Sequence, residues 1–252
     1  MGLKSVRKGK QVTANFVLKI DDDSVPLSAT VPDAKVNGVE MIPVYQRLTN
    51  DLVEHSVTKT LESGKSISCK AGCGACCAQA VPVMAFEAFH LANVVKRMSA
   101  AKQTVVRQRF ADGKTRLQEA GLLTDAENID AMSEEQRRVF GTRYFQLGMS
   151  CPFLENGSCS IYPDRPIRCR EFLVTSDAKY CAQLDPEKID HIETSLSLIP
   201  ALNQLSRANI AKQNAGWMLM NFSLDWAKSQ KHKLRKKHGR VWLEEFIQLA
   251  IK

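Results

Sequence analysis

The sequence contains no run of about 18 apolar residues, which is roughly the length that a helix needs to cross a membrane. Its first ten residues are basic but hold no apolar stretch of the kind that a signal peptide uses. Val6 stands where a myristoylation signal requires Ser or Thr. These absences predict a cytoplasmic protein with no membrane span. A reducing compartment disfavours structural disulfides, so the eight cysteines indicate metal binding or redox chemistry.

Histidine and aromatic residues are also scarce. The five histidines are too scattered to form a metal-binding motif (His55, His90, His191, His232 and His238). His90 lies nearest to the first cysteines but off the apolar face of its predicted helix, so we expect a solvated or locally hydrogen-bonded imidazole. Aromatic residues make up 7% of the chain and do not interleave its basic segments, which disfavours a stacking surface for nucleic acid.

What is present is an ordinary globular composition, with 44% hydrophobic and 25% charged residues over 252 positions. The net charge of +8 is concentrated in the first ten residues and in Lys228–Arg240, which holds seven basic residues and no acidic one. We interpret Lys228–Arg240 as a polar helix face that contacts, at most weakly, an anionic partner. We expect metal binding not to require it.

The apolar periodicity predicts a mainly α fold of the α+β class, with a few small β elements. Residues 12–31 alternate like two short strands, joined by a turn at Asp21–Ser24. A helix is predicted from Pro43 to near Gly64.

Further helices follow the first group of cysteines. One apolar stripe from Met84 to Met98 predicts a core-facing helix, and residues 99–120 predict another. A capping box at Ser133–Gln136 starts a helix that runs toward Leu147. Thr124–Glu127 is a weaker start signal of the same kind.

The last part of the chain is predicted to be helical, with breaks near Pro200, Gly216 and Gly239. We therefore divide the chain into three parts. Residues 1–65 form an N-terminal hairpin and helix, and residues 66–182 form a cysteine-cluster domain. Residues 183–252 form a helical region packed on the same core.

The most informative segment holds four cysteines within nine residues, at Cys69, Cys73, Cys76 and Cys77. Gly72 and Gly74 permit the positive backbone angles with which a loop can curl around one centre. Neighbouring side chains point apart on a strand and about 100° apart on a helix, so Cys76 and Cys77 do not easily bind one small ion. A multi-iron cluster or two separate metals would accommodate them, since different cysteines can bind different irons.

A second group of cysteines follows at Cys151, Cys159 and Cys169. Asn156-Gly157 predicts a tight hairpin turn that brings Cys151 near Cys159. Pro166 opens a short helix whose first turn holds Cys169, where backbone amides and the helix dipole favour a thiolate. Cys181 lies beyond, in a loop, and is the weakest candidate ligand. The two groups are predicted to build one continuous metal site.

With both groups in view, the chain resembles the bacterial cysteine-cluster family described as a zinc- or iron-chelating domain of the CxxCxxCC type. The resemblance covers roughly residues 69–181, and its matching residues are the loop Cys69–Cys77, Cys151-Pro-Phe-Leu, Cys159-Ser-Ile-Tyr, Arg165-Pro166 and Cys169-Arg170. It implies metal or cluster binding. Flagellin lysine N-methylases look similar over this cysteine region, which implies one candidate activity that uses S-adenosylmethionine.

Two other uses of the first cysteines are weaker. Cys69, Cys73 and Cys76 have the spacing of the radical S-adenosylmethionine loop, but Ala75 stands where that loop usually carries an aromatic residue. The sequence also lacks the alternating strands and helices of a barrel, which disfavours radical chemistry. It lacks a strand followed by a Gly-rich turn and a helix, which would indicate a common methyl-donor fold.

All-thiolate ligation favours an iron–sulfur cluster over zinc. Thiolates and sulfides leave a negative charge that Arg165, Arg168 and Arg170 would offset, although these arginines would equally suit surface ion pairs with Asp164 and Glu171. The leading hypothesis is a metal or iron–sulfur protein in electron transfer, cluster handling or redox sensing, with a protein or small-molecule redox partner. The alternatives are an S-adenosylmethionine-dependent protein lysine N-methylase and a metal-stabilised basic interaction module.

Overall fold

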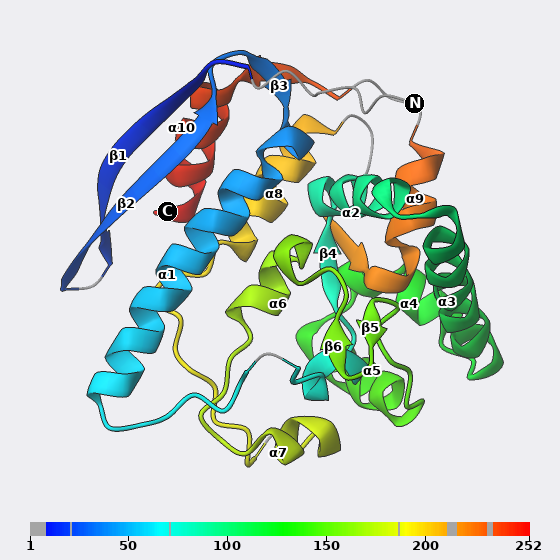
Figure 1. Ribbon diagram of the computed structural model, residues 1–252. Helices are drawn as coiled ribbons and strands as arrows, with labels where there is room; N and C mark the ends of the chain where they lie inside the picture. Colours follow the sequence, from blue (N-terminus) through cyan, green and yellow to red (C-terminus); the bar gives the residue numbers. More distant parts are fainter. Residues whose placement is uncertain (1–8, 21, 71, 186, 211–215, 231–233) are drawn as a thin grey trace.

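The protein is mainly helical, as the periodicity predicts. The computed structural model describes residues 9–20, 22–70, 72–185, 187–210, 216–230 and 234–252. Within them, the strands pair only as two-stranded sheets (Figure 1). The helices are α1 (Ile42–Glu62), α2 (Ala85–Arg97), α3 (Ala100–Glu119), α4 (Leu123–Glu127), α5 (Glu134–Gln146), α6 (Ile167–Glu171), α7 (Ala178–Gln183), α8 (Ile199–Asn209), α9 (Ser223–Ser229) and α10 (Gly239–Ala250). The strands are β1 (Gln11–Ile20), β2 (Asp23–Pro32), β3 (Lys35–Asn37), β4 (Pro82–Met84), β5 (Leu154–Glu155), β6 (Ser158–Cys159), β7 (Trp217–Leu219) and β8 (Lys236–His238).

The N-terminal hairpin is a long two-stranded ribbon. β1 and β2 pair antiparallel from Gln11 opposite Pro32 to Ile20 opposite Asp23. Alternate side chains of β2 are buried, because a strand presents successive residues to opposite faces. The ribbon lies against α1 and α10 (Figure 1). The predicted hairpin is confirmed, and β2 already begins at Asp23, inside the predicted turn.

The first hydrophobic core lies beneath this ribbon and joins distant parts of the chain. It combines buried residues of β2, α1, α2, α8 and α10. Trp242 is fully buried and donates its indole N–H to the carbonyl of Val36 at 2.8 Å. The ring of Tyr45 stacks on that of Phe246, with centroids 4.0 Å apart. The C-terminal helices α8 and α10 therefore share a core with α1, while the three domain boundaries stay a prediction.

A second and a third core hold the other half of the molecule, where α2, α3, α5 and α9 lie (Figure 1). The apolar stripe of α2 is confirmed, since Ala88, Leu91 and Val95 are all fully buried. Phe153, beside the cysteine hairpin, packs on Phe110 of α3 with ring centroids 5.4 Å apart. This contact anchors the hairpin that carries Cys151 and Cys159.

Most predicted helix boundaries agree with the structure. α1 runs from Ile42 to Glu62, and Gly64 follows with a φ of +80°. α5 begins after Ser133, whose side chain accepts the amide of Gln136 as the capping box predicts.

Two local predictions are wrong. Thr124 does not start a helix, because it lies inside the five-residue α4, which follows Leu122 and has no side-chain cap. Lys228–Arg240 is not a continuous helix face: α9 ends at Ser229, and Lys236–His238 form β8, which pairs with β3. Backbone pairing with a distant strand overrides the local pattern there. Residues 231–233 of this segment lie outside the described residues.

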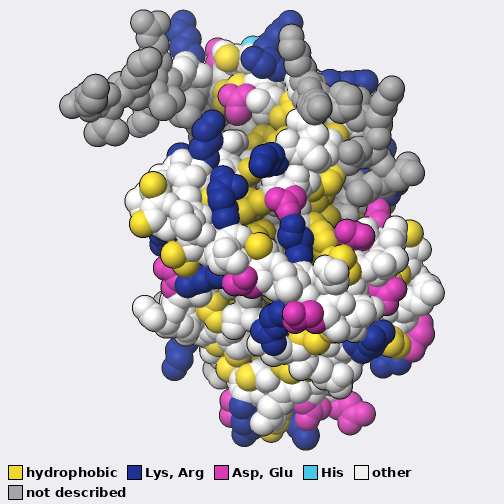
Figure 2. Space-filling view, turned by 90° about the vertical axis from the view of Figure 1, so that its right-hand side faces the viewer, with side chains coloured by type: hydrophobic (Ala, Val, Ile, Leu, Met, Phe, Trp, Pro, Cys, Tyr) yellow, Lys and Arg dark blue, Asp and Glu magenta, His cyan; other side chains and the backbone are white. Residues whose placement is uncertain are grey.

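Among the helices that the structure describes, none combines the length and the apolar composition of a membrane span. On the face shown in Figure 2, Lys and Arg side chains are mostly interspersed with Asp, Glu and hydrophobic side chains. The positive net charge therefore does not form one broad basic field on this face.

Candidate metal centre

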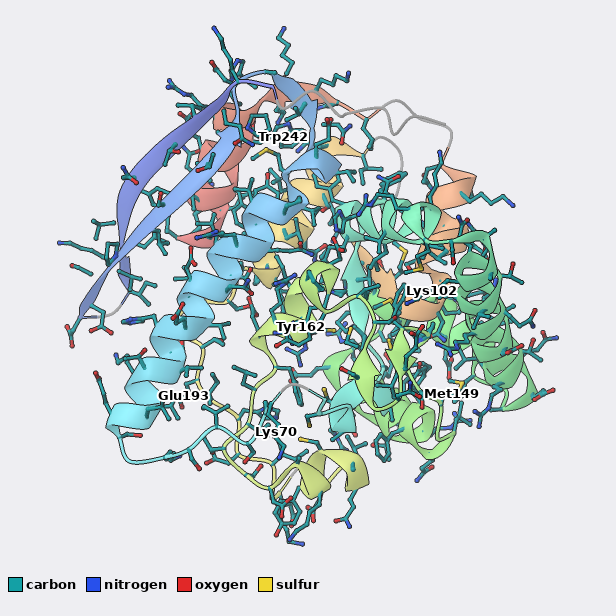
Figure 3. The ribbon with its side chains drawn as sticks, viewed as in Figure 1. Lys70, Lys102, Met149, Tyr162, Glu193 and Trp242 are labelled. Atoms are coloured by element: carbon teal, nitrogen blue, oxygen red, sulfur yellow. The ribbon has the colours of Figure 1, made fainter. Side chains whose placement is uncertain are left out.

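The first four cysteines lie on a loop that ends in a short 3-10 helix, η2 (Ala75–Ala78). Lys70 marks this loop near the foot of the molecule, beside α7 (Figure 3). Two hydrogen bonds fix the start of the loop to the segment before α7. The Ser68 amide donates to the carbonyl of Val174 at 2.9 Å, and the Ser68 hydroxyl donates to the carbonyl of Thr175 at 3.0 Å. Beyond η2, the chain enters β4, which pairs with β7. The loop is thus fixed at both ends.

The two glycines of this loop have different functions. Gly72 has a φ of +83°, so the prediction of a positive backbone angle is confirmed there. For Gly74 that prediction is wrong, since its φ is −104°. A Cβ on Gly74 would lie 2.7 Å from Leu154 Cδ1 and 2.9 Å from the carbonyl oxygen of Gly157. Gly74 therefore allows the loop to approach the hairpin closely.

Cys76 and Cys77 are hydrogen-bonded to each other within η2. The Cys77 thiol donates to Cys76, and this bond lowers the pKa of Cys76 to about 7. The same bond, together with burial, raises the pKa of Cys77. Cys76 is therefore the thiol of this pair that ionises more easily, and a thiolate is the form that binds metals.

The hairpin that carries Cys151 and Cys159 joins the first group directly. The Cys151 amide donates to the carbonyl of Cys77 at 2.7 Å. Asn156 and Gly157 have φ values of 50° and 76°, as the predicted type I′ turn requires, and they set Cys159 opposite Leu154. Burial raises the pKa of Cys151 to about 12. A backbone bond thus links two groups of cysteines that are far apart in sequence.

Cys169 lies in the first turn of α6, as predicted, and its amide donates to the carbonyl of Pro166 at 3.0 Å. The expectation that the helix start favours a Cys169 thiolate is wrong, because burial and then the neighbouring Cys151 and Cys76 raise the pKa of Cys169 well above its usual range. α6 has only five residues, so its dipole is small.

Cys181 lies on α7 rather than in a loop, and it is 3% exposed. α7 packs against η2. Burial raises the pKa of Cys181 to about 11, and the charges of Cys69, Cys76 and Cys73 add to this effect. Cys181 therefore belongs with the first group of thiols.

We call the eight cysteines the cysteine centre, and Cys76 interacts electrostatically with six of the other seven. Its charge raises the pKa of these six: Cys69, Cys77, Cys151, Cys159, Cys169 and Cys181. Such an influence needs proximity, because screening weakens charge interactions over about 10 Å. The fold thus collects thiols from η2, the hairpin, α6 and α7 around Cys76.

The donor set fits a soft metal centre, since all eight cysteines are free of disulfides and thiolates suit zinc and iron–sulfur clusters. In the described part of the chain, no three His, Cys, Asp or Glu side chains are arranged to hold one metal ion. Side-chain rotation would have to bring the thiols onto a common centre. Coupling of ligand geometry to metal binding is common in small metal sites.

Two arginines place positive charge beside the thiols. Arg165 lies over the ring of Tyr162, 4.0 Å from its centroid, and its charge favours the thiolates of Cys69 and Cys159. Arg170 is 4% exposed and donates to the Asn50 side chain at 2.9 Å. Among the described residues, neither arginine pairs with a carboxylate within 4 Å, so the alternative of surface ion pairs with Asp164 and Glu171 is not seen.

His90 is buried rather than solvated, and its Nε2 lies 2.8 Å from Asp164 Oδ1. The prediction of local hydrogen bonding is therefore confirmed. Glu87 is a residue that the sequence patterns did not single out. Its carboxylate accepts the amides of Met84 at 2.9 Å and Ile167 at 2.7 Å, which fixes the start of α6. Its place in the first turn of a predicted helix was the only local signal.

Comparison with family models agrees with this geometry. Residues 68–191 match the model of the CxxCxxCC family, named "Putative zinc- or iron-chelating domain". This part of the chain belongs to that family, and the resemblance of the cysteine pattern is confirmed. The match extends beyond Cys181 and thus includes all eight cysteines. No curated protein and no solved structure matches the chain.

Proposed function

We propose that the cysteine centre binds an iron–sulfur cluster and that the protein acts in electron transfer or redox sensing. The observation that carries this proposal is the position of Cys76, which lies within electrostatic reach of six other cysteine thiols from the first loop, the hairpin, α6 and α7. A structural zinc ion binds all of its ligands at one metal atom, which adjacent cysteines do not easily reach together. A multi-iron cluster distributes its ligands over several irons, so adjacent Cys76 and Cys77 can both participate.

The surrounding charges support the same choice. Thiolate-ligated clusters carry negative charge, and positive charge beside them favours the reduced, more negative state. Arg165 and Arg170 supply that charge beside the thiols of Cys159 and Cys69. A cluster would supply one-electron transfer, and the protein would hold it through the cysteine thiolates.

The test is the metal content of anaerobically purified protein after iron-supplemented expression. We expect brown protein with iron and acid-labile sulfide that is reversibly reduced by dithionite. Colourless protein with stoichiometric zinc would contradict the proposal. Oxygen must be excluded throughout, because oxidation of the thiols could mimic a negative result.

The two alternative functions make different predictions. A lysine N-methylase has to bind S-adenosylmethionine, and calorimetric titration with this compound tests this alternative. A metal-stabilised interaction module would bind metal but show no reversible reduction.

A further inference from the structure

A cavity of about 690 Å³ adjoins the cysteine centre, and neither the metal site nor the core accounts for it. Cys76 and Cys169 both form part of its wall. Residues of β4, α5, α6, α8 and β7 contribute to the rest of the wall. Figure 1 shows β4 and α8 beside α6. Ligand sites in proteins commonly enclose about 300–1,000 Å³, so this cavity has the size of a small-molecule site.

The wall is mostly apolar and rich in rings. Phe140 of α5, Phe172 beyond α6 and Trp217 of β7 approach it from three elements. Met84 and Leu219 add aliphatic surface. Rings of this kind stack favourably on a flat aromatic body and remove it from water.

The charged part of the wall has one sign. Arg137, Arg138 and Arg168 contribute to it, and no Asp or Glu does. Arg138 is neutralised by Glu135, to which it donates two hydrogen bonds, and Arg137 donates to the carbonyl of Met132. Arg168 lies 5.9 Å from the Phe172 ring centroid and forms no ion pair with a described residue. A guanidinium in this position suits a carboxylate, which it can bind through two parallel hydrogen bonds.

Two amide side chains in the wall also lack partners. Gln79 Nε2 and Asn203 Oδ1 are buried, and neither is hydrogen-bonded within the described part of the chain. Buried polar atoms without a partner are uncommon in native structures, and each calls for an explanation. A ligand in this cavity with further polar atoms would give them partners.

We propose that this cavity binds an aromatic carboxylate, with its acid group at Arg168 and its rings against Phe140, Phe172 and Trp217. The site adjoins Cys169, the residue next to Arg168, so the bound molecule lies beside the cysteine centre. This inference goes beyond metal binding. It holds whether the centre takes iron or zinc.

The test uses two fluorescent probes that differ in charge, 1-pyrenebutyrate and the neutral 1-pyrenebutanol, with the purified, metal-containing full chain. We expect one pyrenebutyrate per chain, bound at least tenfold more tightly than the alcohol. Arg168→Gln should weaken pyrenebutyrate at least tenfold and change the alcohol less than twofold. Arg107→Gln is the matched control, since Arg107 is exposed on α3 and is not part of the cavity wall.

A second variant tests the position of the apolar body without risking the fold. A Cβ on Gly141 of α5, which is part of the wall, would meet no atom within 4 Å. Gly141→Leu should therefore occupy the cavity, lower the affinity for both probes at least tenfold and leave the melting temperature at or above that of the parent. Absence of pyrenebutyrate binding, or binding that neither Arg168→Gln nor Gly141→Leu changes, would overturn the proposal.

Discussion

Two regions of this molecule, the ribbon half and the cysteine region, are held together by different means. The half built on the β1–β2 ribbon, α1, α8 and α10 is an ordinary hydrophobic core with large, fully buried side chains such as Trp242 and Tyr45. The cysteine region is built from elements of two to six residues, and most of its cysteines are only partly buried. Short elements each bury few apolar side chains, so they gain less free energy from packing than the long ribbon and helices do. The comparison indicates that this region depends on its metal for stability, whereas the ribbon half does not.

The largest expected effect follows from removing the metal. Structural thiolate sites contribute on the order of 10 kcal/mol to folding. An anaerobic chelator should therefore release backbone protection in residues 69–77 and 151–183, while the β1–β2 ribbon and α1 stay protected. Hydrogen exchange followed by mass spectrometry measures both regions in one sample. Equal loss of protection in both halves would show that they are not independent in this way.

Core truncation should have the converse effect. Trp242→Ala removes a fully buried ring and its bond to Val36, and such truncations cost about 3–5 kcal/mol. We expect a lower urea midpoint with an unchanged metal content per folded chain. Val241→Ala, at an exposed neighbouring site, should change stability by less than about 0.5 kcal/mol. A loss of metal from the folded Trp242→Ala variant would show that the ribbon half and the cysteine region are more tightly coupled than we infer.

Glu87 connects the two regions and should make stability depend on pH. Burial raises its pKa from 4.5 to about 7, so the folded state favours the protonated carboxyl. The contribution of Glu87 to stability is thus full below its unfolded pKa and is lost as the pH rises through about 7, at a cost of about 3 kcal/mol.

Glu87→Gln should flatten this part of the stability profile between pH 4.5 and about 7. Urea unfolding across that range measures the change. Glu244→Gln, at an exposed position of α10, is the control and should keep the parent profile. A slope that persists in Glu87→Gln would have to come from another group.

The smallest effect is expected from the basic segment. Lys228, Arg235, Lys236 and Arg240 are exposed and lie outside the cysteine centre. Changing them together to glutamine should leave the metal content unchanged, while Lys237, which pairs with Glu245, is kept. Metal analysis is the measurement. Loss of metal from this variant would make the segment part of the site.

Local patterns predicted those features that nearby residues determine. The α2 stripe, the Ser133 cap and the Asn156-Gly157 turn depend on residues a few positions apart, and all three are confirmed. The pairing of β8 with β3 depends on residues about 200 positions away, so no local pattern revealed it. The same reason explains why the close approach of Gly74 to the hairpin was not predicted.

The ligand candidates were identified because cysteines at such density are unusual, but their arrangement was not predictable. That Cys76 interacts with six other cysteines follows from the packing of η2 against α7 and from the bond between Cys151 and Cys77. The cavity behind Cys169 also arises only when α5, α6 and α8 come together. The sequence predicted that the charge of Arg168 would offset that of a cluster, but it did not predict the place of Arg168 in the wall of this cavity.

The central claim is that the two groups of cysteines form one centre. Metal content and melting temperature of Cys73→Ser and Cys159→Ser, measured side by side with the parent protein under anaerobic conditions, test it most directly. We expect each single change to lower the metal content and the melting temperature together, because each removes a ligand from the same site. Full metal occupancy and an unchanged melting temperature in Cys159→Ser would contradict it and make the hairpin cysteines a separate feature.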